Sequence, residues 1–408
     1  MTRHVVIAGG GPAGMMLGLL LARAGLRATL LEKHADFLRD FRGDTIHPST
    51  LEVMHELGLL EGLLRLPHQE VPQFAAKFGD REIAVADLSH LPTHCRFIAM
   101  MPQWDFLAFL AREAARSPHF ELRMSAEVTS LIERDGRIAG VRVGDDEVDA
   151  ELVVGADGRH SSVRAHSGLQ VEEFGAPMDV LWFRLSRRAG DPDATMALFD
   201  AGRIVVLIYR GDYWQCGYVI AKGAAEEVRR SGLPALRAGI AKLLRFLADR
   251  VEELADWEQI KLLTVRVDRL RQWYRPGLLC IGDAAHAMSP VAGVGINLAI
   301  QDAVAAANIL WRPLREGSLS TDDLRQVQKR REWPVRVTQR LQLMVQQRVI
   351  ARVLGTGERL TPPLFLRLLA RYPWLRRIAG RLIGLGIRPE HVKTIAASPE
   401  RAPRGTKG

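Results

Sequence analysis

The sequence predicts an α/β (α+β) fold with a Rossmann-like domain, a mostly antiparallel β-sheet domain interleaved with it, and a C-terminal helical segment. Three observations predict this fold. An apolar, β-branched run near the N-terminus leads into a glycine-rich turn and a helical pattern. Two later apolar runs also end in a glycine-flanked acid, and residues 177–266 change to alternating, strand-like segments. Parallel strands that are buried on both faces are continuous apolar runs, whereas half-exposed antiparallel strands alternate.

The glycine-rich turn has the G-x-G-x-x-G spacing, and it comprises Gly9, Gly11, Pro12, Ala13 and Gly14. The first glycine permits a tight turn, the second lets the backbone approach a pyrophosphate, and the third lets the helix pack closely on the strand. The helix N-terminus offers free N–H groups to the phosphates. A second strand, at 28–31, ends at Glu32, whose carboxylate would accept hydrogen bonds from ribose hydroxyls. The whole unit predicts a dinucleotide-binding site.

The segments that follow alternate between helices and short strands. Apolar periodicity is poor over 37–48, which predicts a loop, and Ser49 is expected to cap a helix that runs to a stop at Gly58. Further patterns predict short strands around 74, 83–85 and 97–99, a helix over 103–115, and a hairpin over 128–143.

The alternating segment has its strand candidates at 180–185, 195–199, 203–209 and 213–220, with a helical insert at 224–253. We expect it to form a substrate-binding sheet that the strands near 70–98 join. A chain of 408 residues is long enough for two domains and an appendage. We therefore divide it into a discontinuous dinucleotide-binding domain (1–68, 99–176 and 267–330), a β-sheet domain (69–98 and 177–266) and a basic helical region (331–408).

Three predicted strands end in polar, glycine-rich corners, at 9–14, 155–159 and 282–297. In open α/β sheets, ligands bind outside the carboxyl ends of the strands. We therefore expect the three corners to surround one extended dinucleotide.

Composition excludes several other classes. The three cysteines are widely spaced, with no C-x-x-C pair, which argues against a disulfide framework or a metal site and favours a reducing cytoplasm. The run Gly-Gly-Gly-Pro interrupts the N-terminal apolar stretch, which argues against a signal peptide. No uninterrupted apolar run reaches about 18 residues, so no transmembrane helix is expected.

The net charge of +9 is concentrated at the C-terminal end, where residues 321–408 carry 19 Lys and Arg against 6 Asp and Glu. Such a segment suggests nucleic acid. However, its arginines alternate with apolar residues at helical spacing, as in 366–371, so no nucleic-acid partner is expected. The pattern predicts amphipathic helices that pack on the body, the interpretation we favour, or that make peripheral contact with a membrane.

The motifs GGGPAG, GADGR, GDAAH and PVAGVGIN occur in this order, at 9–14, 155–159, 282–286 and 290–297. As a set they resemble those of the single-component (class A) flavin-dependent aromatic hydroxylases, which have the p-hydroxybenzoate hydroxylase fold. The resemblance covers roughly residues 1–310. It implies FAD as the cofactor, held by the three corners.

The resemblance also implies a role for each motif. The first motif, with Glu32 and Lys33, would hold the ADP half of FAD. The loop and helix start that carry Arg42 and Gln103 would contact the flavin nucleotide. The remaining residues that the resemblance assigns to the pyrophosphate, the ribityl chain and the isoalloxazine ring are Asp157, Gly158, Gly282, Asp283, Pro290, Gly293, Gly295, Ile296 and Asn297.

The activity that the resemblance implies is monooxygenation. NAD(P)H would reduce the flavin, O₂ would add to give a flavin hydroperoxide, and a small organic substrate, aromatic or polyketide-like, would take one oxygen atom. The sequence contains no second dinucleotide fingerprint. This agrees with the family, in which the nicotinamide cofactor binds transiently.

A catalytic base is harder to assign. His47 follows the Arg42 loop and could face the substrate as a general base, or it could be structural. His286 is better explained as a support of the third motif. Tyr209, Tyr213 and Arg184 on predicted strands are weaker candidates.

Other functions remain open on the same fold. A halogenase is one, but its family carries a Trp-x-Trp-x-Ile-Pro motif that this sequence lacks. A prenyl-lipid reductase would suit the basic amphipathic tail. A non-catalytic flavin-binding module is the third alternative.

Overall fold

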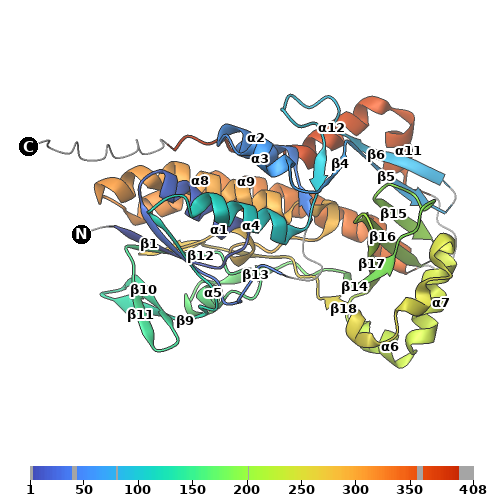
Figure 1. Cartoon of the computed structure of the whole chain (residues 1–408), viewed down its shortest axis with the longest axis horizontal. Coiled ribbons are helices and arrows are strands. Elements are labelled where there is room, and N and C mark those ends of the chain that lie inside the picture. The colour runs from blue at the N-terminus through green and yellow to red at the C-terminus, as the bar shows by residue number, and fades with distance from the viewer. Residues whose placement is uncertain (1–2, 39–43, 80, 201, 356–361, 395–408) are drawn as a thin grey trace, which may run out of the picture.

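The computed structural model describes residues 3–38, 44–79, 81–200, 202–355 and 362–394 (Figure 1). Two sheets lie toward opposite ends of the long axis, and long helices cover the first sheet and run along that axis toward the second. The fold is α/β, as the sequence predicts.

The first sheet has six strands and carries the glycine-rich corners. Its order is β20 (Tyr274–Arg275), β21 (Leu278–Cys280), β12 (Leu152–Gly155), β1 (His4–Ala8), β2 (Arg27–Leu31) and β8 (Phe120–Arg123). Strand β1 pairs in parallel with β12 and β2, and β12 pairs in parallel with β21. Its helices are α1 (Pro12–Arg23), α4 (Gln103–Ala114), α8 (Gly295–Glu316) and α9 (Thr321–Val345).

Helix α8 lies at the centre of the helical layer, packed against α1 and α9 (Figure 1). The segment Val291–Glu316 is long and apolar enough to cross a membrane by composition alone. However, 78% of its most apolar window is buried inside the protein. Burial on this scale identifies α8 as a core helix.

The second sheet has seven strands, in the order β18 (Lys261–Leu263), β14 (Met178–Ser186), β17 (Tyr213–Ala221), β16 (Arg203–Tyr209), β15 (Met196–Asp200), β5 (Gln73–Phe78) and β6 (Arg81–Asp87). All neighbours are antiparallel except β15 and β5. One face packs on the helical insert, which contains α6 (Ala225–Arg230), α7 (Leu233–Leu243) and the single 3₁₀ turns Arg245–Leu247, Val251–Glu253 and Trp257–Gln259. The four strands and the insert that the sequence predicts over 180–253 are thus confirmed.

The smaller elements complete the list. They are the sheet β9 (Val128–Arg134), β10 (Arg137–Val143) and β11 (Asp146–Asp149), the pair β13 (Val171–Glu173) and β19 (Asp268–Leu270), and the helices α2 (Pro48–Glu56), α3 (Leu60–Leu64) and α5 (Ser162–His166). Single 3₁₀ turns at Gly282–Ala284 and Val291–Gly293 precede α8. A π-turn, Gln346–Ile350, leads from α9 to α10 (Ala351–Leu354), α11 (Leu364–Arg371) and α12 (Pro373–Gly384).

Three local predictions need correction. The strand near 97–99 does not join the seven-stranded sheet, because β7 (Ile98–Met100) pairs with β3 (Thr45–Ile46) and β4 (Gln69–Val71) in a separate sheet. Ser49 does not cap α2, because it lies inside the helix. Helix α2 begins at Pro48, and His47 is its N-cap residue. Proline favours this first helical position because its φ angle is already helical. The boundary predicted at 330/331 falls inside the continuous helix α9. The remaining domain boundaries stay predictions.

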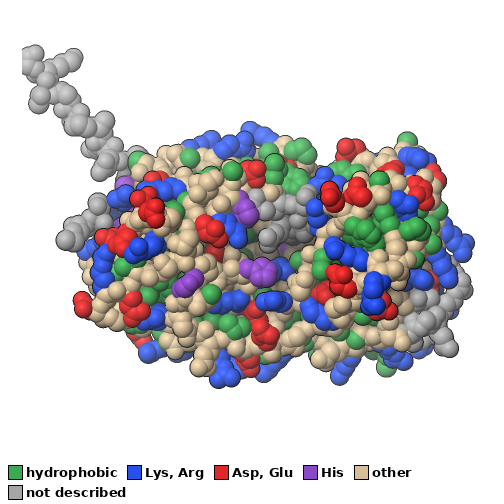
Figure 2. Space-filling view, turned by 90° about the horizontal axis from the view of Figure 1, so that it is seen from below, with side chains coloured by type: hydrophobic (Ala, Val, Ile, Leu, Met, Phe, Trp, Pro, Cys, Tyr) green, Lys and Arg blue, Asp and Glu red, His purple; other side chains and the backbone are tan. Residues whose placement is uncertain are grey.

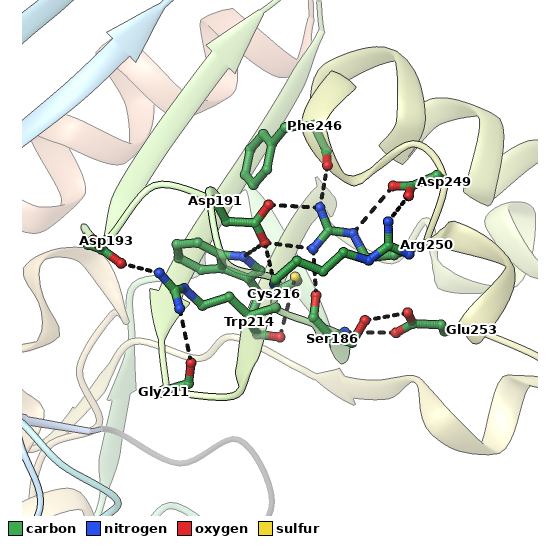
Figure 3. A network of polar contacts seen from close by, with 12 residues as sticks. Ser186, Asp191, Asp193, Gly211, Trp214, Cys216, Phe246, Asp249, Arg250 and Glu253 are labelled. Atoms are coloured by element: carbon green, nitrogen blue, oxygen red, sulfur yellow. Dashed lines mark hydrogen bonds and ion pairs between the residues drawn. The ribbon is translucent and has the colours of Figure 1, made fainter.

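A buried ion pair joins the helical insert to the seven-stranded sheet (Figure 3). Arg250 donates from Nη1 to Asp191 Oδ2 at 2.6 Å and from Nη2 to Asp191 Oδ1 at 2.9 Å, and it also reaches the Ser186 carbonyl. The indole N–H of Trp214 donates to the same carboxylate at 3.2 Å. The hydrogen bonds from Arg250 hold the pKa of Asp191 well below its ordinary value. The side chain of Arg250 is 3% exposed and that of Asp191 is 9% exposed, so removing either partner leaves the other charge largely shielded from water and unpaired.

Replacing Arg250 by methionine should destabilise the protein by about 3–5 kcal/mol, because it leaves a buried carboxylate unpaired. Thermal unfolding followed by circular dichroism measures the effect. The double variant Asp191→Asn/Arg250→Met should recover part of the loss. Arg188→Met is the matched control, since its ion pair with Asp249 is exposed and its loss should hardly change unfolding. Equal destabilisation by Arg250→Met and Arg188→Met would contradict the assignment.

Candidate functional site

The three predicted corners meet at one edge of the six-stranded sheet. Strands β1, β12 and β21 are parallel neighbours, so their carboxyl ends lie together. A Cβ on Gly9 would lie 2.5 Å from the Ala156 carbonyl oxygen, and one on Gly282 would lie 3.1 Å from the Ala13 Cβ. Both positions therefore favour glycine, because a side chain at either one would crowd the neighbouring turn. Across the gap, Arg159 Nη2 lies 3.6 Å from Asp283 Oδ2.

Backbone donors line the open side of this edge. Helix α1 begins after Gly11 and α8 after Val294, and neither N-cap residue makes a side-chain cap. The first N–H groups of both helices therefore have no partner within their own helix. A Cβ on Gly158 or Gly295 would meet nothing within 4 Å. Free donors beside open space are what a pyrophosphate and the carbonyl edge of a flavin require, so the residues present fit FAD.

Glu32, the predicted ribose contact, is held by backbone hydrogen bonds. Its Oε2 accepts the N–H of Gly10 at 2.8 Å and its Oε1 accepts the N–H of His34 at 3.1 Å. The carboxylate is buried, whereas neighbouring Lys33 is exposed. The backbone thus holds Glu32 in a defined position beside the glycine turn.

Asp157 is engaged in the start of α5. Its carboxylate accepts the hydroxyl of Ser161 at 2.5 Å and the N–H of Val163 at 3.1 Å. Burial raises the pKa of Asp157, although these hydrogen bonds act in the opposite direction. The side chain supports the turn, and the backbone of Gly158 is the part of this corner that borders open space.

A buried charge behind the third corner was not singled out from the sequence. Asp302 on α8 accepts the N–H of Gly282 at 3.1 Å, contacts His286 Nε2 at 2.5 Å and accepts from Arg331 Nε at 3.0 Å. Burial alone would raise the pKa of Asp302, but His286 and Arg331 outweigh burial and hold the pKa below its ordinary value. Arg331 also lies 3.4 Å from Glu390. The sequence gives one indication of this role, because Asp302 is the one charged residue between positions 295 and 310.

Two side chains of the segment before α2 contact the loop that leads into α8. Thr45 Oγ1 donates to the Gly293 carbonyl at 2.7 Å, and His47 Nε2 lies 3.1 Å from the same oxygen. Gly293 has a φ of +62°, and a Cβ there would lie 2.5 Å from Thr45 Oγ1. Ala292 has a φ of +64°, which is uncommon for a residue with a side chain and indicates local strain. Pro290 is exposed at the start of this loop.

His47 lies differently from the position expected of a general base. It is fully buried, and its Nδ1 lies 2.7 Å from the carbonyl oxygen of Ile383 on α12. Burial lowers the pKa of His47 to about 4. At neutral pH the ring is uncharged and carries one N–H, so it donates to one of these two carbonyls while the other ring nitrogen only lies against the second. Enclosed between two backbone segments, the side chain is better placed for packing than for taking a proton from a substrate.

Ile296 and Asn297 form the buried first turn of α8. Asn297 Oδ1 accepts the hydroxyls of Ser49 at 2.7 Å and Thr50 at 2.8 Å. The side-chain oxygen of Asn297 thus accepts hydrogen bonds from two residues of α2. Its backbone, with that of Gly295, remains the candidate for flavin contact.

A second buried cluster connects the loop before β3 to the seven-stranded sheet. Asp44 and Arg210 form an ion pair in which both side chains are buried, and Gln215 Nε2 donates to Asp44 Oδ2 at 2.9 Å. The backbone of Gln103 also bonds to Asp44. Burial raises the pKa of Asp44, and Arg210 acts against this. Gln103 is thus placed at this junction, whereas Arg42 lies outside the described residues.

The three weaker candidates divide between the two faces of this sheet. Arg184 lies over the Tyr213 ring, 5.0 Å from its centroid, on the face that Gln215 shares. Tyr209 instead packs toward the helical insert, where it meets Trp214 edge-on. Tyr209 therefore lies on the opposite face of the sheet from Arg184 and Gln215.

Comparisons with known proteins decide the family. A family model described as an FAD binding domain matches residues 2–340. The 6-methylpretetramide 4-monooxygenase of Streptomyces rimosus is 33% identical over 388 residues, covering 93% of this chain and 91% of that protein. The chain belongs to the FAD-dependent monooxygenases.

Two further similarities extend this assignment. The crystal structure of PqsL, a probable FAD-dependent monooxygenase from Pseudomonas aeruginosa, superposes with a TM-score of 0.73, covering 86% of this monooxygenase and 97% of PqsL at 21% identity. The dialkyldecalin synthase of Streptomyces rugosporus is 28% identical over 76% of this chain. The chain spans only 65% of that longer relative. The expected FAD-binding fold is confirmed, and FAD is the cofactor.

The position of His47 predicts a pH dependence of stability. Its pKa is near 4 in the folded monooxygenase and 6.5 in the reference state, so the unfolded chain takes up the proton first as pH falls. Stability should therefore fall from about pH 6.5 down to about pH 4, by about 3 kcal/mol from this residue. His47→Gln should be less stable at neutral pH, yet lose less stability across that window. Melting temperatures of both proteins at stepped pH test this, and parallel curves would contradict the assignment.

Proposed function

We propose that this monooxygenase hydroxylates an aromatic or polyketide-like small molecule, with NAD(P)H as reductant and O₂ as the oxygen source. In balance, the substrate, O₂, NAD(P)H and a proton give the hydroxylated product, NAD(P)⁺ and water. The observation that carries the substrate class is the 33% identity, over nearly the full length of both chains, to a 6-methylpretetramide 4-monooxygenase. The three cysteines are buried free thiols, which supports a cytoplasmic location.

The start of α8 would provide electrostatic stabilisation at the flavin. When bound, FAD would accept the hydride and transfer the oxygen atom. The free N–H groups of Gly295, Ile296 and Asn297, with the positive end of the helix dipole, would stabilise negative charge at the carbonyl edge of the ring. The hydrogen bond from Thr45 to the Gly293 carbonyl, with His47 packed against the same oxygen, would keep these donors in position.

We call residues 290–294, which lead into α8, the flavin loop. Apolar packing on one side of this loop would help to exclude water from the flavin. Val291 packs against a cluster formed by the seven-stranded sheet and the C-terminal helices, which includes Val180, Val219, Val349 and Ile350. A dry surround favours oxygen transfer over unproductive side reactions. The sheet face that carries Gln215 and Arg184 would then supply polar contacts to the substrate.

Oxygen consumption is the direct test of this function. The FAD-loaded protein should oxidise NADPH or NADH and consume one O₂ for each product formed, with isotopically labelled O₂ leaving one labelled atom in the product. Phenolic and polycyclic aromatic compounds are the substrates to screen. One relative is named a synthase, so product formation without O₂ uptake would contradict the proposal and favour a reaction of that kind. Flavin reduction without any product would favour the non-catalytic alternative.

Asp283 tests whether the three corners form one FAD site. The variant Asp283→Ala removes a charged acceptor for the ribityl hydroxyls, which costs about 1.5–3 kcal/mol of binding. FAD affinity, measured by fluorescence titration, should fall roughly tenfold to hundredfold.

Asp322→Ala is the matched control, because this acid lies exposed on α9 and pairs with Arg325. Its FAD affinity should stay that of the unaltered protein. Normal affinity in Asp283→Ala would mean that the ribityl chain lies elsewhere.

A further inference from the structure

We propose that helices α11 and α12 dock this enzyme onto the surface of an anionic lipid bilayer. The outward face of this helix pair is apolar. Of the thirteen large apolar side chains that are exposed among the described residues, seven lie here: Leu364, Phe365, Leu368, Tyr372, Trp374, Ile378 and Leu382. Leu364 is 68% exposed and Trp374 is 59% exposed. Apolar side chains gathered in one place mark an interaction surface, whereas scattered ones need no explanation.

The inward face of the pair is already packed, so this exposure does not come from loose helices. Leu366 of α11 is buried in an apolar cluster with the seven-stranded sheet. On α12, a Cβ at Gly380 would collide with the Asp87 carbonyl, and one at Gly384 would lie 2.8 Å from Leu91. Both glycines let α12 approach the body closely. The packing favoured from the sequence thus accounts for one face only.

The charge of this segment complements an anionic surface. Between residues 362 and 389 the sequence has six arginines and no aspartate or glutamate. Arg367, Arg371, Arg377 and Arg381 are exposed beside the apolar side chains. Figure 2 shows the side of the molecule turned away from these helices, where acidic and basic side chains are interspersed. The unbalanced positive charge thus accompanies the exposed apolar face.

The dimensions and chemistry of the pair suit a position within the plane of the interface. Helix α11 has 8 residues and α12 has 12, which gives lengths of about 12 and 18 Å. Neither can cross a hydrocarbon core of about 30 Å. Aromatic and aliphatic side chains flanked by arginines are typical of helices that lie at the headgroup boundary. A second copy of the chain would bring two such arginine clusters together, which electrostatic repulsion opposes.

The experiment is co-flotation of the full-length, FAD-loaded protein with vesicles. We expect binding to mixed phosphatidylglycerol–phosphatidylcholine vesicles at about 50 mM salt, release at about 500 mM salt, and little binding to pure phosphatidylcholine. Trp374→Ser/Ile378→Ser should weaken binding at least tenfold and leave NAD(P)H oxidation in solution unchanged. Val171→Ser/Leu262→Ser is the matched control, because it removes two exposed apolar side chains elsewhere and should bind normally.

Charge is tested separately. Arg377→Gln/Arg381→Gln should weaken binding to the anionic vesicles and reduce its salt dependence, with circular dichroism confirming the fold.

Three results would overturn the proposal. The first is no flotation at low salt, and the second is normal flotation of Trp374→Ser/Ile378→Ser. The third is a concentration-dependent dimer, seen by sedimentation without vesicles and abolished in that variant, which would make a second copy the occupant. Failure of hydroxylation would leave this inference intact, since flotation does not depend on turnover.

Discussion

The geometry of the cofactor site depends on one buried carboxylate, that of Asp302. It holds the N–H of Gly282, the ring of His286 and the guanidinium of Arg331, which itself reaches Glu390. A buried charge that loses a partner costs several kcal/mol, so these contacts must form together. The turn that begins at Gly282 is therefore positioned by α8, α9 and the C-terminal segment at once. The five-residue motif at 282–286 therefore holds its conformation through contacts with residues that lie far from it in the sequence.

The loop before α8, at residues 290–294, also lies where the two sheets are joined. Thr45 and His47 hold Gly293, and neighbouring Asp44 forms a buried ion pair with Arg210 of the seven-stranded sheet. Because Asp44 and Thr45 are adjacent in the chain, one short segment contacts both the seven-stranded sheet and the loop before α8. The uncommon backbone conformation of Ala292 lies within that loop. Local strain persists where the surroundings over-determine it, and here Thr45 and His47 both contact the carbonyl of the adjacent Gly293.

Helix α12 connects this junction to the outer surface. Its last turn offers carbonyl oxygens to His47 and to Ser49, while the opposite face exposes Trp374 and Ile378. One helix therefore has an inner face that supports the site and an outer face free for another partner. The glycines Gly380 and Gly384 permit both, because they let the helix lie close to the body without using its outer side chains.

Sequence alone determined the parts whose causes are local. The turn from Gly9 to Gly14, the helix that follows it and the hairpin over 128–143 depend on glycine spacing and on periodicity within a few residues. Tertiary structure decided the rest, because the partners lie far apart in the chain. Gln215 and Asp44 are separated by 171 residues, and nothing near His47 indicates that Ile383 will occupy its ring nitrogen. Periodicity predicted that α11 and α12 have two faces. Only packing decided which face is covered, because burial depends on the shape of the surface that the helix meets.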